Sequence, residues 1–332
     1  MERVCIVGAG VIGSLFAGHL ARVCEVSVLT RRREHADALN TDGLRVSGKT
    51  EYGARVTATD DPDELPPFDL AIIATKASGL EAAARALDGR FPEATIVTVL
   101  NGIGAEEVVR AHGEWPIVSG VTFMSGTRHS DTHVEYILDT ETWLGPHEDT
   151  PKELVDEITA LLVASGLKAT AFDDLGPARW SKLIFNATVN TVSALTQLGH
   201  VGLFAREETP TDLGHLVHEL MDEGKRVAEA AGVQLHEDPW EMNVLAVRRG
   251  ETQASDYAHV PSMLEDVRAE RLTEVDFITG ALVREAERLG VPVPLHTAMY
   301  RLVKGREASF PGAGQAPAAE PGHRQTVERS SA

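Results

Sequence analysis

Short apolar runs and segments of helical periodicity alternate through the first half of this chain. The runs are bounded by glycine or polar residues, which is typical of buried parallel strands. They lie at 4–7, 26–29, 69–74, 95–100 and 117–120. The helical segments lie at 14–22, 80–87 and 152–165. Alternating strands and helices predict an α/β domain with a parallel sheet, in which 117–120 would be an edge strand.

Several shorter segments also predict strands. They lie at 43–46, 55–59, 133–137, 142–145 and 167–172. We expect 133–137 and 142–145 to form an antiparallel pair added to the sheet, and 167–172 to be the last strand of the first domain.

From residue 174 the strand pattern stops and helical periodicity takes over. Helices are expected at 178–197, 212–232, 239–249 and 264–289. The sequence therefore predicts two domains, an α/β domain over 1–173 and an all-α domain over 174–304. Residues 305–332 are rich in Pro, Gly, Ala and Ser, and we expect a disordered tail because they cannot bury much apolar surface.

The helix expected at 180–190 carries polar residues where a buried helix should be apolar. Lys182, Asn186 and Asn190 recur at steps of four, which places them in a row on one helical face. The other faces are apolar, and buried lysine and asparagine are costly without partners. This row is predicted to line a polar cavity.

Composition narrows the class of ligand. The chain has 332 residues and a formal net charge of −19, which argues against nucleic acid or an anionic membrane as a partner. An anionic small molecule would therefore need a local cluster of cations or backbone N–H groups.

The two cysteines and the apolar segments bear on cellular location. Cys5 and Cys24 have neither the number nor the spacing of a disulfide framework or a metal site, so we expect no bound metal. No signal peptide precedes the first strand, and no apolar run approaches the roughly 20 residues that span a bilayer. The expectation is a cytoplasmic protein.

A glycine motif follows the first predicted strand directly. It reads Gly8-Ala9-Gly10-Val11-Ile12-Gly13 and leads into a helix and a second strand. In this context the motif predicts a dinucleotide site, with Gly8 for the tight turn, Gly10 for approach of the pyrophosphate and Gly13 for helix–strand packing. The alternative is a glycine-rich turn with no ligand.

The end of the second strand indicates which dinucleotide binds. An acidic residue there favours NAD, whereas arginine favours the 2′-phosphate of NADP. Here Thr30 is followed by Arg31, Arg32 and Arg33. In so acidic a chain these arginines favour NADP(H), with Arg31 the best placed, although a solvated basic turn would give the same sequence.

Further candidates stand at strand ends and late in the chain. Lys76 and Asn101 follow buried strands, where α/β sheets bind ligands, although each could be an ordinary loop residue. Ser262 and Glu265 have the spacing of a capping box, a structural role. Glu274 lies twelve residues after Ser262, so one helix would carry both on one side.

Taken together, these motifs resemble those of the 2-dehydropantoate 2-reductase (ketopantoate reductase) family over about residues 3–304. The motifs that carry the resemblance are Gly8 to Gly13, Arg31, Thr75-Lys76, Asn101-Gly102, Lys182, Asn186, Asn190, Pro261-Ser262-Met263-Leu264 and Glu274. The resemblance implies an NADP-binding Rossmann domain, an all-helical domain with the active site in the cleft between them, and a homodimer. It also implies NADPH-dependent reduction of a 2-oxo acid in pantothenate biosynthesis.

The resemblance assigns roles at the reacting end of the site. Lys182 would be the general acid, Lys76 and Asn101 would contact the nicotinamide end and the substrate, and Glu274 would hold the cofactor. These roles agree with physical chemistry, because hydride addition builds negative charge on the carbonyl oxygen, and a lysine can stabilise and then protonate it.

The resemblance also assigns Asn186, Asn190 and Ser262 to the polar groups of the substrate. The chain departs from the family pattern at Thr191, where many members have proline, and at His200, where many have asparagine. His200 is a substrate-binding candidate, either for a different or larger 2-oxo acid or as a tolerated replacement.

Three other functions remain open on the sequence. The first is a paralogous NADPH-dependent reductase of another keto acid or an imine, for instance in secondary metabolism. The second is a non-catalytic NADP(H)-binding regulator, in which loss of Lys182 or Glu274 would be expected. The third is an acyl-anion or opine-type dehydrogenase with the same two-domain plan and a His–Asp pair in the helical domain. His215 and His218 are available for such a pair but lack an evident partner in sequence.

Overall fold

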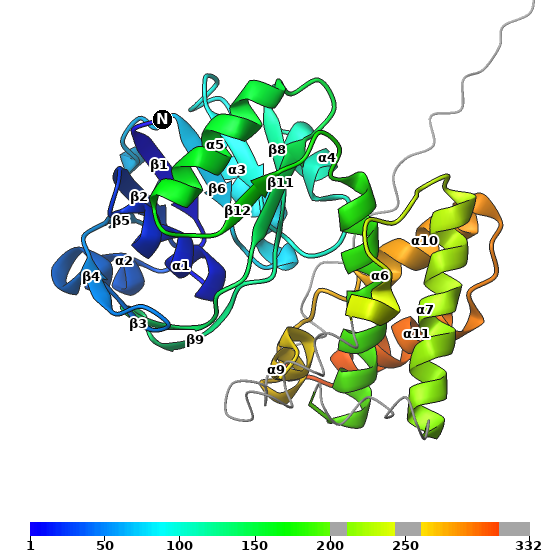
Figure 1. Cartoon of the computed structure of the whole chain (residues 1–332). Coiled ribbons are helices and arrows are strands. Elements are labelled where there is room, and N and C mark those ends of the chain that lie inside the picture. The colour runs from blue at the N-terminus through cyan, green and yellow to red at the C-terminus, as the bar shows by residue number, and fades with distance from the viewer. Residues whose placement is uncertain (200–210, 243–259, 312–332) are drawn as a thin grey trace, which may run out of the picture.

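The computed structural model describes residues 1–199, 211–242 and 260–311 (Figure 1). His200 and most of the helix expected at 239–249 lie outside the described residues. Strands occupy the first part of the chain up to Ala171, and helices follow from Gly176. The fold is thus a Rossmann-like α/β domain followed by an all-α domain.

The large sheet of the first domain contains eight strands. They are β1 (Arg3–Val7), β2 (Glu25–Leu29), β5 (Thr57–Thr59), β6 (Leu70–Ile73), β7 (Thr95–Thr98), β8 (Ile117–Thr122), β11 (Thr142–Pro146) and β12 (Ala169–Ala171). Their order is β12-β11-β8-β7-β6-β1-β2-β5, and every neighbouring pair is parallel except β8 with β11. The segment 117–120 is therefore not an edge strand, because β11 pairs antiparallel outside it.

A second, smaller sheet corrects the expected pairing of 133–137 with 142–145. It contains β3 (Leu44–Gly48), β4 (Tyr52–Ala54), β9 (Ser125–Ser130) and β10 (His133–Leu138), in the order β4-β3-β10-β9. β10 pairs with β9 rather than with β11. Strand β9 was not predicted, because most of it is polar and exposed and no apolar run marks it.

Helices cover both faces of the large sheet. They are α1 (Val11–Leu20), α2 (Arg33–Asp42), α3 (Leu80–Leu87), α4 (Ala105–Arg110) and α5 (Lys152–Ala164). Side chains of α1 and α5 share one apolar core with the sheet, and those of α3 and α4 share another. α1 begins at Val11, directly after Gly10, so its N-terminus opens at the glycine turn.

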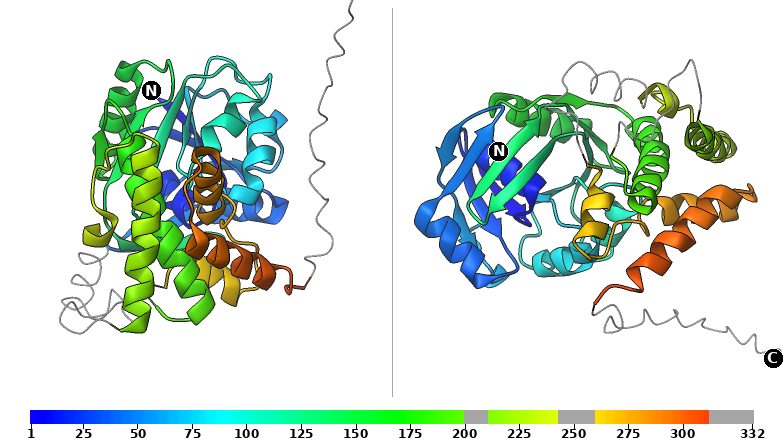
Figure 2. Two further views of the ribbon diagram at one scale, coloured as in Figure 1. Left: turned by 90° about the vertical axis from the view of Figure 1, so that its right-hand side faces the viewer. Right: turned by 90° about the horizontal axis from the view of Figure 1, so that it is seen from below.

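The second domain is built around one long central helix. Its described helices are α6 (Gly176–Thr196), α7 (Asp212–Ala230), α9 (Ser262–Arg268), α10 (Thr279–Leu289) and α11 (Pro294–Glu307). α6 packs against α7, α9, α10 and α11, and Figure 2 shows it between the sheet domain and the other helices. No helix in the described ranges is both long and apolar enough to cross a membrane.

Two expectations for the end of the chain were wrong. The single helix expected at 264–289 is divided, because Glu270 takes a left-handed φ of 51° that ends α9, and α10 begins only at Thr279. The tail does not begin at residue 305, because α11 continues to Glu307 and Phe310 is buried in the helical core.

An ion pair between the buried Glu106 and the partly buried Arg179 ties α6 to the sheet domain. The Arg179 guanidinium donates to Glu106 at 2.7 Å and to the Ser119 hydroxyl at 3.3 Å, and the Thr98 hydroxyl donates to Glu106 at 2.8 Å. Burial alone would raise the pKa of Glu106, but the adjacent Arg179 charge holds that pKa below its usual value. The first turn of α6 is therefore fixed to β7, β8 and α4.

We predict that Arg179→Met lowers the free energy of unfolding by about 3–5 kcal/mol, because it leaves the Glu106 carboxylate buried without its partner. Replacing both residues together, as in Arg179→Met with Glu106→Leu, should recover much of that loss. Chemical denaturation measures both values. Arg85→Ala is the control, because its pair with Glu81 is exposed and should contribute about 0–1 kcal/mol; equal losses in the single and double variants would contradict the prediction.

Candidate functional site

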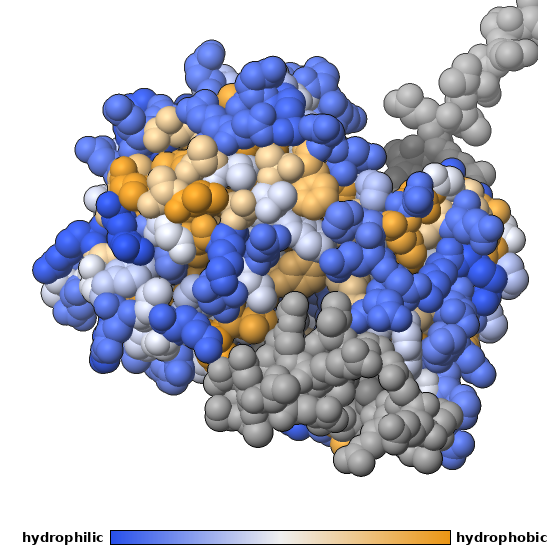
Figure 3. Space-filling model, viewed as in Figure 1, coloured by the Kyte–Doolittle hydropathy of each residue, from blue (hydrophilic) through white to orange (hydrophobic). Residues whose placement is uncertain are grey.

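One large cavity, with a volume of about 2120 Å³, runs between the two domains. It brings together nearly all the residues singled out from the sequence. Those that line it are Gly8, Ala9, Gly10, Val11, Ile12, Arg31, Lys76, Asn101, Lys182, Asn186, Asn190, Ser262 and Glu274. On the face seen in Figure 3, hydrophilic residues outnumber hydrophobic ones among the coloured residues.

The glycine turn has the geometry that its motif predicts. Gly8 has a φ of 101°, and a Cβ at Gly13 would lie 1.9 Å from the Gly8 carbonyl oxygen. Neither position can therefore take a side chain without rearrangement. A Cβ at Gly10 would meet nothing within 4 Å, so this glycine leaves open space beside the N-terminus of α1. Such a helix end offers N–H groups and a positive dipole end to a phosphate.

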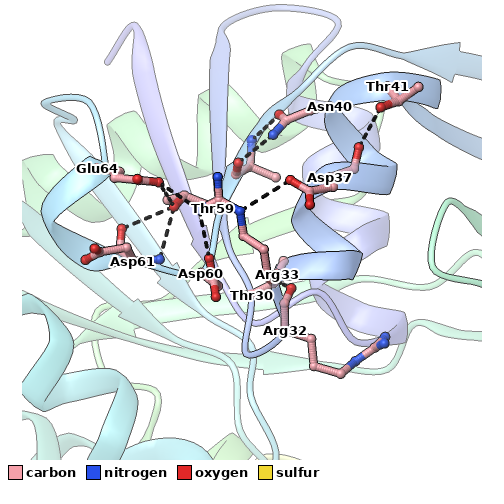
Figure 4. A network of polar contacts seen from close by, with 11 residues as sticks. Thr30, Arg32, Arg33, Asp37, Asn40, Thr41, Thr59, Asp60, Asp61 and Glu64 are labelled. Carbon is pink, nitrogen blue, oxygen red and sulfur yellow. Dashed lines mark hydrogen bonds and ion pairs between the residues drawn. The ribbon is translucent and has the colours of Figure 1, made fainter.

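The three consecutive arginines have different surroundings. Arg32 pairs with Asp131 at 2.7 Å and Arg33 with Asp60 at 3.3 Å. Figure 4 shows Arg33 directed toward the carboxylates around Thr59, whereas Arg32 points away from them. Arg31 lines the cavity and forms no ion pair with any residue in the described ranges.

Lys182 is buried on α6, with a side chain 9% exposed. Its ammonium group donates a hydrogen bond to the Thr122 carbonyl oxygen at 2.6 Å and lies 4.8 Å from the centre of the Phe123 ring. Burial lowers the pKa of Lys182 to about 8, although the nearby Glu274 carboxylate acts in the opposite direction. The amine is therefore held at the end of β8 with a pKa close to neutral pH.

Asn186 and Asn190 continue the same face of α6, as the periodicity predicted. Their side chains are 8% and 6% exposed, and both line the cavity. Neither amide has a hydrogen-bond partner among the residues that the structure describes. Buried amides that face a cavity without protein partners can hydrogen-bond a polar ligand.

Glu274 joins the helical domain to the strand ends of the sheet domain. Its carboxylate accepts from the Ala77 N–H at 3.3 Å and from the Asn101 side chain at 3.2 Å. Asn101 is thus held from the side of the helical domain. The turn after it also needs glycine, because a Cβ at Gly102 would lie 1.9 Å from the Phe277 carbonyl oxygen.

Lys76 bridges the domains in a similar way. Its ammonium pairs at 2.8 Å with Asp266 of α9, whose carboxylate also accepts from Arg271 at 3.0 Å. Burial acts to lower the pKa of Lys76, but the Glu274 and Asp266 carboxylates outweigh it and raise that pKa. Lys76 is therefore a charged group at the mouth of the cavity.

Two expectations at this site need correction. Ser262 is not a helix cap, because Pro261 occupies that position and α9 begins at Ser262 without a side-chain cap. Ser262 and Glu274 do not share one helix, yet the fold brings both to the cavity. Thr191 does not line the cavity; its hydroxyl donates to the Ala187 carbonyl at 2.6 Å within α6.

Sequence reasoning missed three residues that shape the site. The Thr122 carbonyl and the Phe123 ring contact the Lys182 ammonium. The Asp266 carboxylate pairs with Lys76. The position of Thr122 and Phe123 at the C-terminal end of a core strand could have identified them. His218 pairs with Asp222 along α7 at 3.2 Å, and neither lines the cavity.

Comparison with known proteins gives the same family along nearly the whole chain. The family model described as ketopantoate reductase PanE/ApbA matches residues 4–149, and its C-terminal counterpart matches residues 174–307. A 2-dehydropantoate 2-reductase of Streptococcus pyogenes is 29% identical over 313 residues, covering 92% of this chain and 98% of the relative. One from Pyrococcus horikoshii is 27% identical over 306 residues, with the same coverage.

Solved structures agree with the fold. A PanE/ApbA family ketopantoate reductase from Ralstonia eutropha has a TM-score of 0.79 and 27% identity, covering 92% of this chain and 98% of that one. A D-mandelate dehydrogenase in complex with NADH and anilino(oxo)acetate has a TM-score of 0.83 at 24% identity, covering 93% and 99%, which supports the fold alone. The chain belongs to the ketopantoate reductase family and is an oxidoreductase.

Proposed function

We propose that this protein uses NADPH to reduce a 2-oxo acid, in the first instance 2-dehydropantoate, to the corresponding 2-hydroxy acid. The observation that carries the proposal is Lys182, a buried amine with a lowered pKa that faces an interdomain cavity, beside two amides with no hydrogen-bond partner in the described ranges. The names of the relatives, 2-dehydropantoate 2-reductase, supply the substrate to test first.

The residues present fit a nicotinamide dinucleotide. The open space at Gly10 and the N-terminus of α1 suit the pyrophosphate, and Glu274 with Asn101 suits the nicotinamide end. Bound NADPH would supply the hydride to the carbonyl carbon. The division near residue 174 then separates a cofactor domain from a helical domain that supplies most of the substrate contacts.

The protein groups act on the carbonyl oxygen and on the carboxylate. As negative charge develops on the oxygen, the Lys182 ammonium stabilises it and transfers its proton there, leaving a neutral amine. Asn186, Asn190 and Ser262 donate hydrogen bonds that orient the substrate. Lys76, at the cavity mouth, adds positive charge for an anionic substrate. A non-catalytic regulator has less support, because it would not need a buried amine of lowered pKa.

Replacing Lys182 tests the mechanism. We expect Lys182→Met to lower kcat/KM for 2-dehydropantoate by about 10²–10⁴, the usual contribution of a positioned general acid. In the unchanged enzyme, kcat/KM should fall as pH rises through about 8, because only the protonated amine can donate. Steady-state rates with NADPH across pH 6–10 measure both effects.

Lys182→Arg is the matched control, because it keeps the charge but holds its proton throughout this range. It should remain slow and lose the decline near pH 8. Near-normal turnover in Lys182→Met would refute the role of this residue. If no 2-oxo acid is reduced with either NADPH or NADH, the proposed reaction itself is wrong.

Arg31 tests the choice of cofactor. We expect Arg31→Ala to raise the KM for NADPH by about 10- to 100-fold, because a charge-assisted contact to the 2′-phosphate contributes about 1.5–3 kcal/mol. The KM for NADH should change little. Arg33→Ala is the control, since Arg33 already pairs with Asp60 and Glu64. An equal change with both cofactors would exclude recognition of the 2′-phosphate by Arg31.

A further inference from the structure

Two aromatic side chains form a wall of the cavity beside Lys182. The Phe123 ring lies 4.8 Å from the Lys182 ammonium, and the Trp143 ring packs against Phe123 with their centres 4.9 Å apart. Both residues line the cavity. The proposed mechanism gives neither of them a task.

The position of this wall in the sheet separates it from the cofactor residues. Gly8, Arg31, Lys76 and Asn101 follow β1, β2, β6 and β7. Phe123 follows β8 and Trp143 lies on β11, which are the next two strands beyond β7. The aromatic wall therefore lies beyond the reacting end of the cofactor site.

The distance from Lys182 limits what can contact the ring. A carbonyl oxygen that accepts a proton from Lys182 must approach its nitrogen to about 2.6–3.2 Å. With the centre of the Phe123 ring 4.8 Å from that nitrogen, a substituent of the carbonyl carbon that lies on the side of the ring is within van der Waals reach of it.

The carbonyl carbon of a 2-oxo acid carries a carboxylate and a side chain, and their chemistry decides which of them faces the ring. The electron-rich face of an aromatic ring disfavours a carboxylate and offers it no donor. Asn186 and Asn190, on the row that continues from Lys182, have amide donors without described protein partners. The substrate carboxylate is therefore expected to accept hydrogen bonds from the two asparagines. The side chain of the 2-oxo acid then packs against the Phe123 ring.

We propose that Phe123 and Trp143 form the side-chain subsite of the 2-oxo acid, and that this subsite favours a bulky apolar substituent, an aryl group included. This inference rests on the proposed reduction of 2-oxo acids.

Contacts within the protein hold the aromatic wall in place. The Trp143 side chain is 8% exposed and donates its indole N–H to Glu141 at 2.9 Å. The rings of Phe172 and His236 pack behind it, at 5.6 and 5.3 Å. A preformed apolar surface costs little reorganisation when a ligand binds.

The test compares 2-oxo acids that differ only in their side chains. With the full-length enzyme and NADPH, we expect kcat/KM for phenylglyoxylate and for 2-oxoisovalerate to exceed that for pyruvate. Phe123→Ala should lower the ratio of kcat/KM for phenylglyoxylate over pyruvate by about 10- to 200-fold, because hydrophobic pockets discriminate at that scale. Using a ratio removes any uniform effect of the lost ring on Lys182.

Phe91→Ala is the matched control, because Phe91 is also half-buried and in a ring pair, with Phe68, but lies outside this cavity. Its ratio should equal that of the unchanged enzyme. Trp143→Leu provides a second test of the same subsite if Phe123→Ala does not fold. A preference for pyruvate, or a ratio unchanged in the subsite variants, would overturn the inference while the reductase function stands. Absence of activity toward every 2-oxo acid would instead refute the proposed function.

Discussion

The ion pair between the partly buried Arg179 and the buried Glu106 is the constraint on which the geometry of the cavity depends. Glu106 stands in the first turn of α4, and α4 follows the loop that carries Asn101. Arg179 stands one turn before Lys182 on α6. The ion pair therefore fixes the spacing between the loop of the proposed cofactor site and the helix of the proposed acid, within an interior where an unpartnered charge would be costly.

The contacts of Lys182 follow from that placement. With α6 anchored against β8, the lysine reaches the Thr122 carbonyl at the end of the same strand that supplies Ser119 to Arg179. Two successive turns of α6 thus form hydrogen bonds with β8. Burial in this junction is the largest cause of the lowered pKa of the amine, so the same packing that joins the domains also adjusts its acidity.

Local sequence patterns predicted those parts of the molecule that neighbouring residues determine. The glycine turn, the buried row on α6 and the alternation of strands with helices all depend on neighbouring residues, and the structure contains them. The strand β9 was missed because it is polar and no apolar run marks it, although it pairs with the strand that follows it, β10. The break after α9 was missed because a distant contact helps to determine it: Glu307 of α11 accepts from the Thr273 N–H. The contacts of Asp266 with Lys76 and of Phe123 with Lys182 could not be predicted, because the partners lie far apart in sequence, although the place of Phe123 at a strand end could have marked it as a candidate.

Glu274 and Asp266 have a consequence for how the cleft opens. Both carboxylates belong to the helical domain, yet they hold Ala77, Asn101 and Lys76 of the sheet domain. Some of the contacts between the domains thus involve Asn101, Lys76 and Glu274, which are also proposed to meet the nicotinamide end. Separation of the domains and exchange of the proposed cofactor would then both change these same contacts. The two equilibria are therefore thermodynamically linked. A ligand that replaces those bonds with its own can enter without the full cost of breaking them.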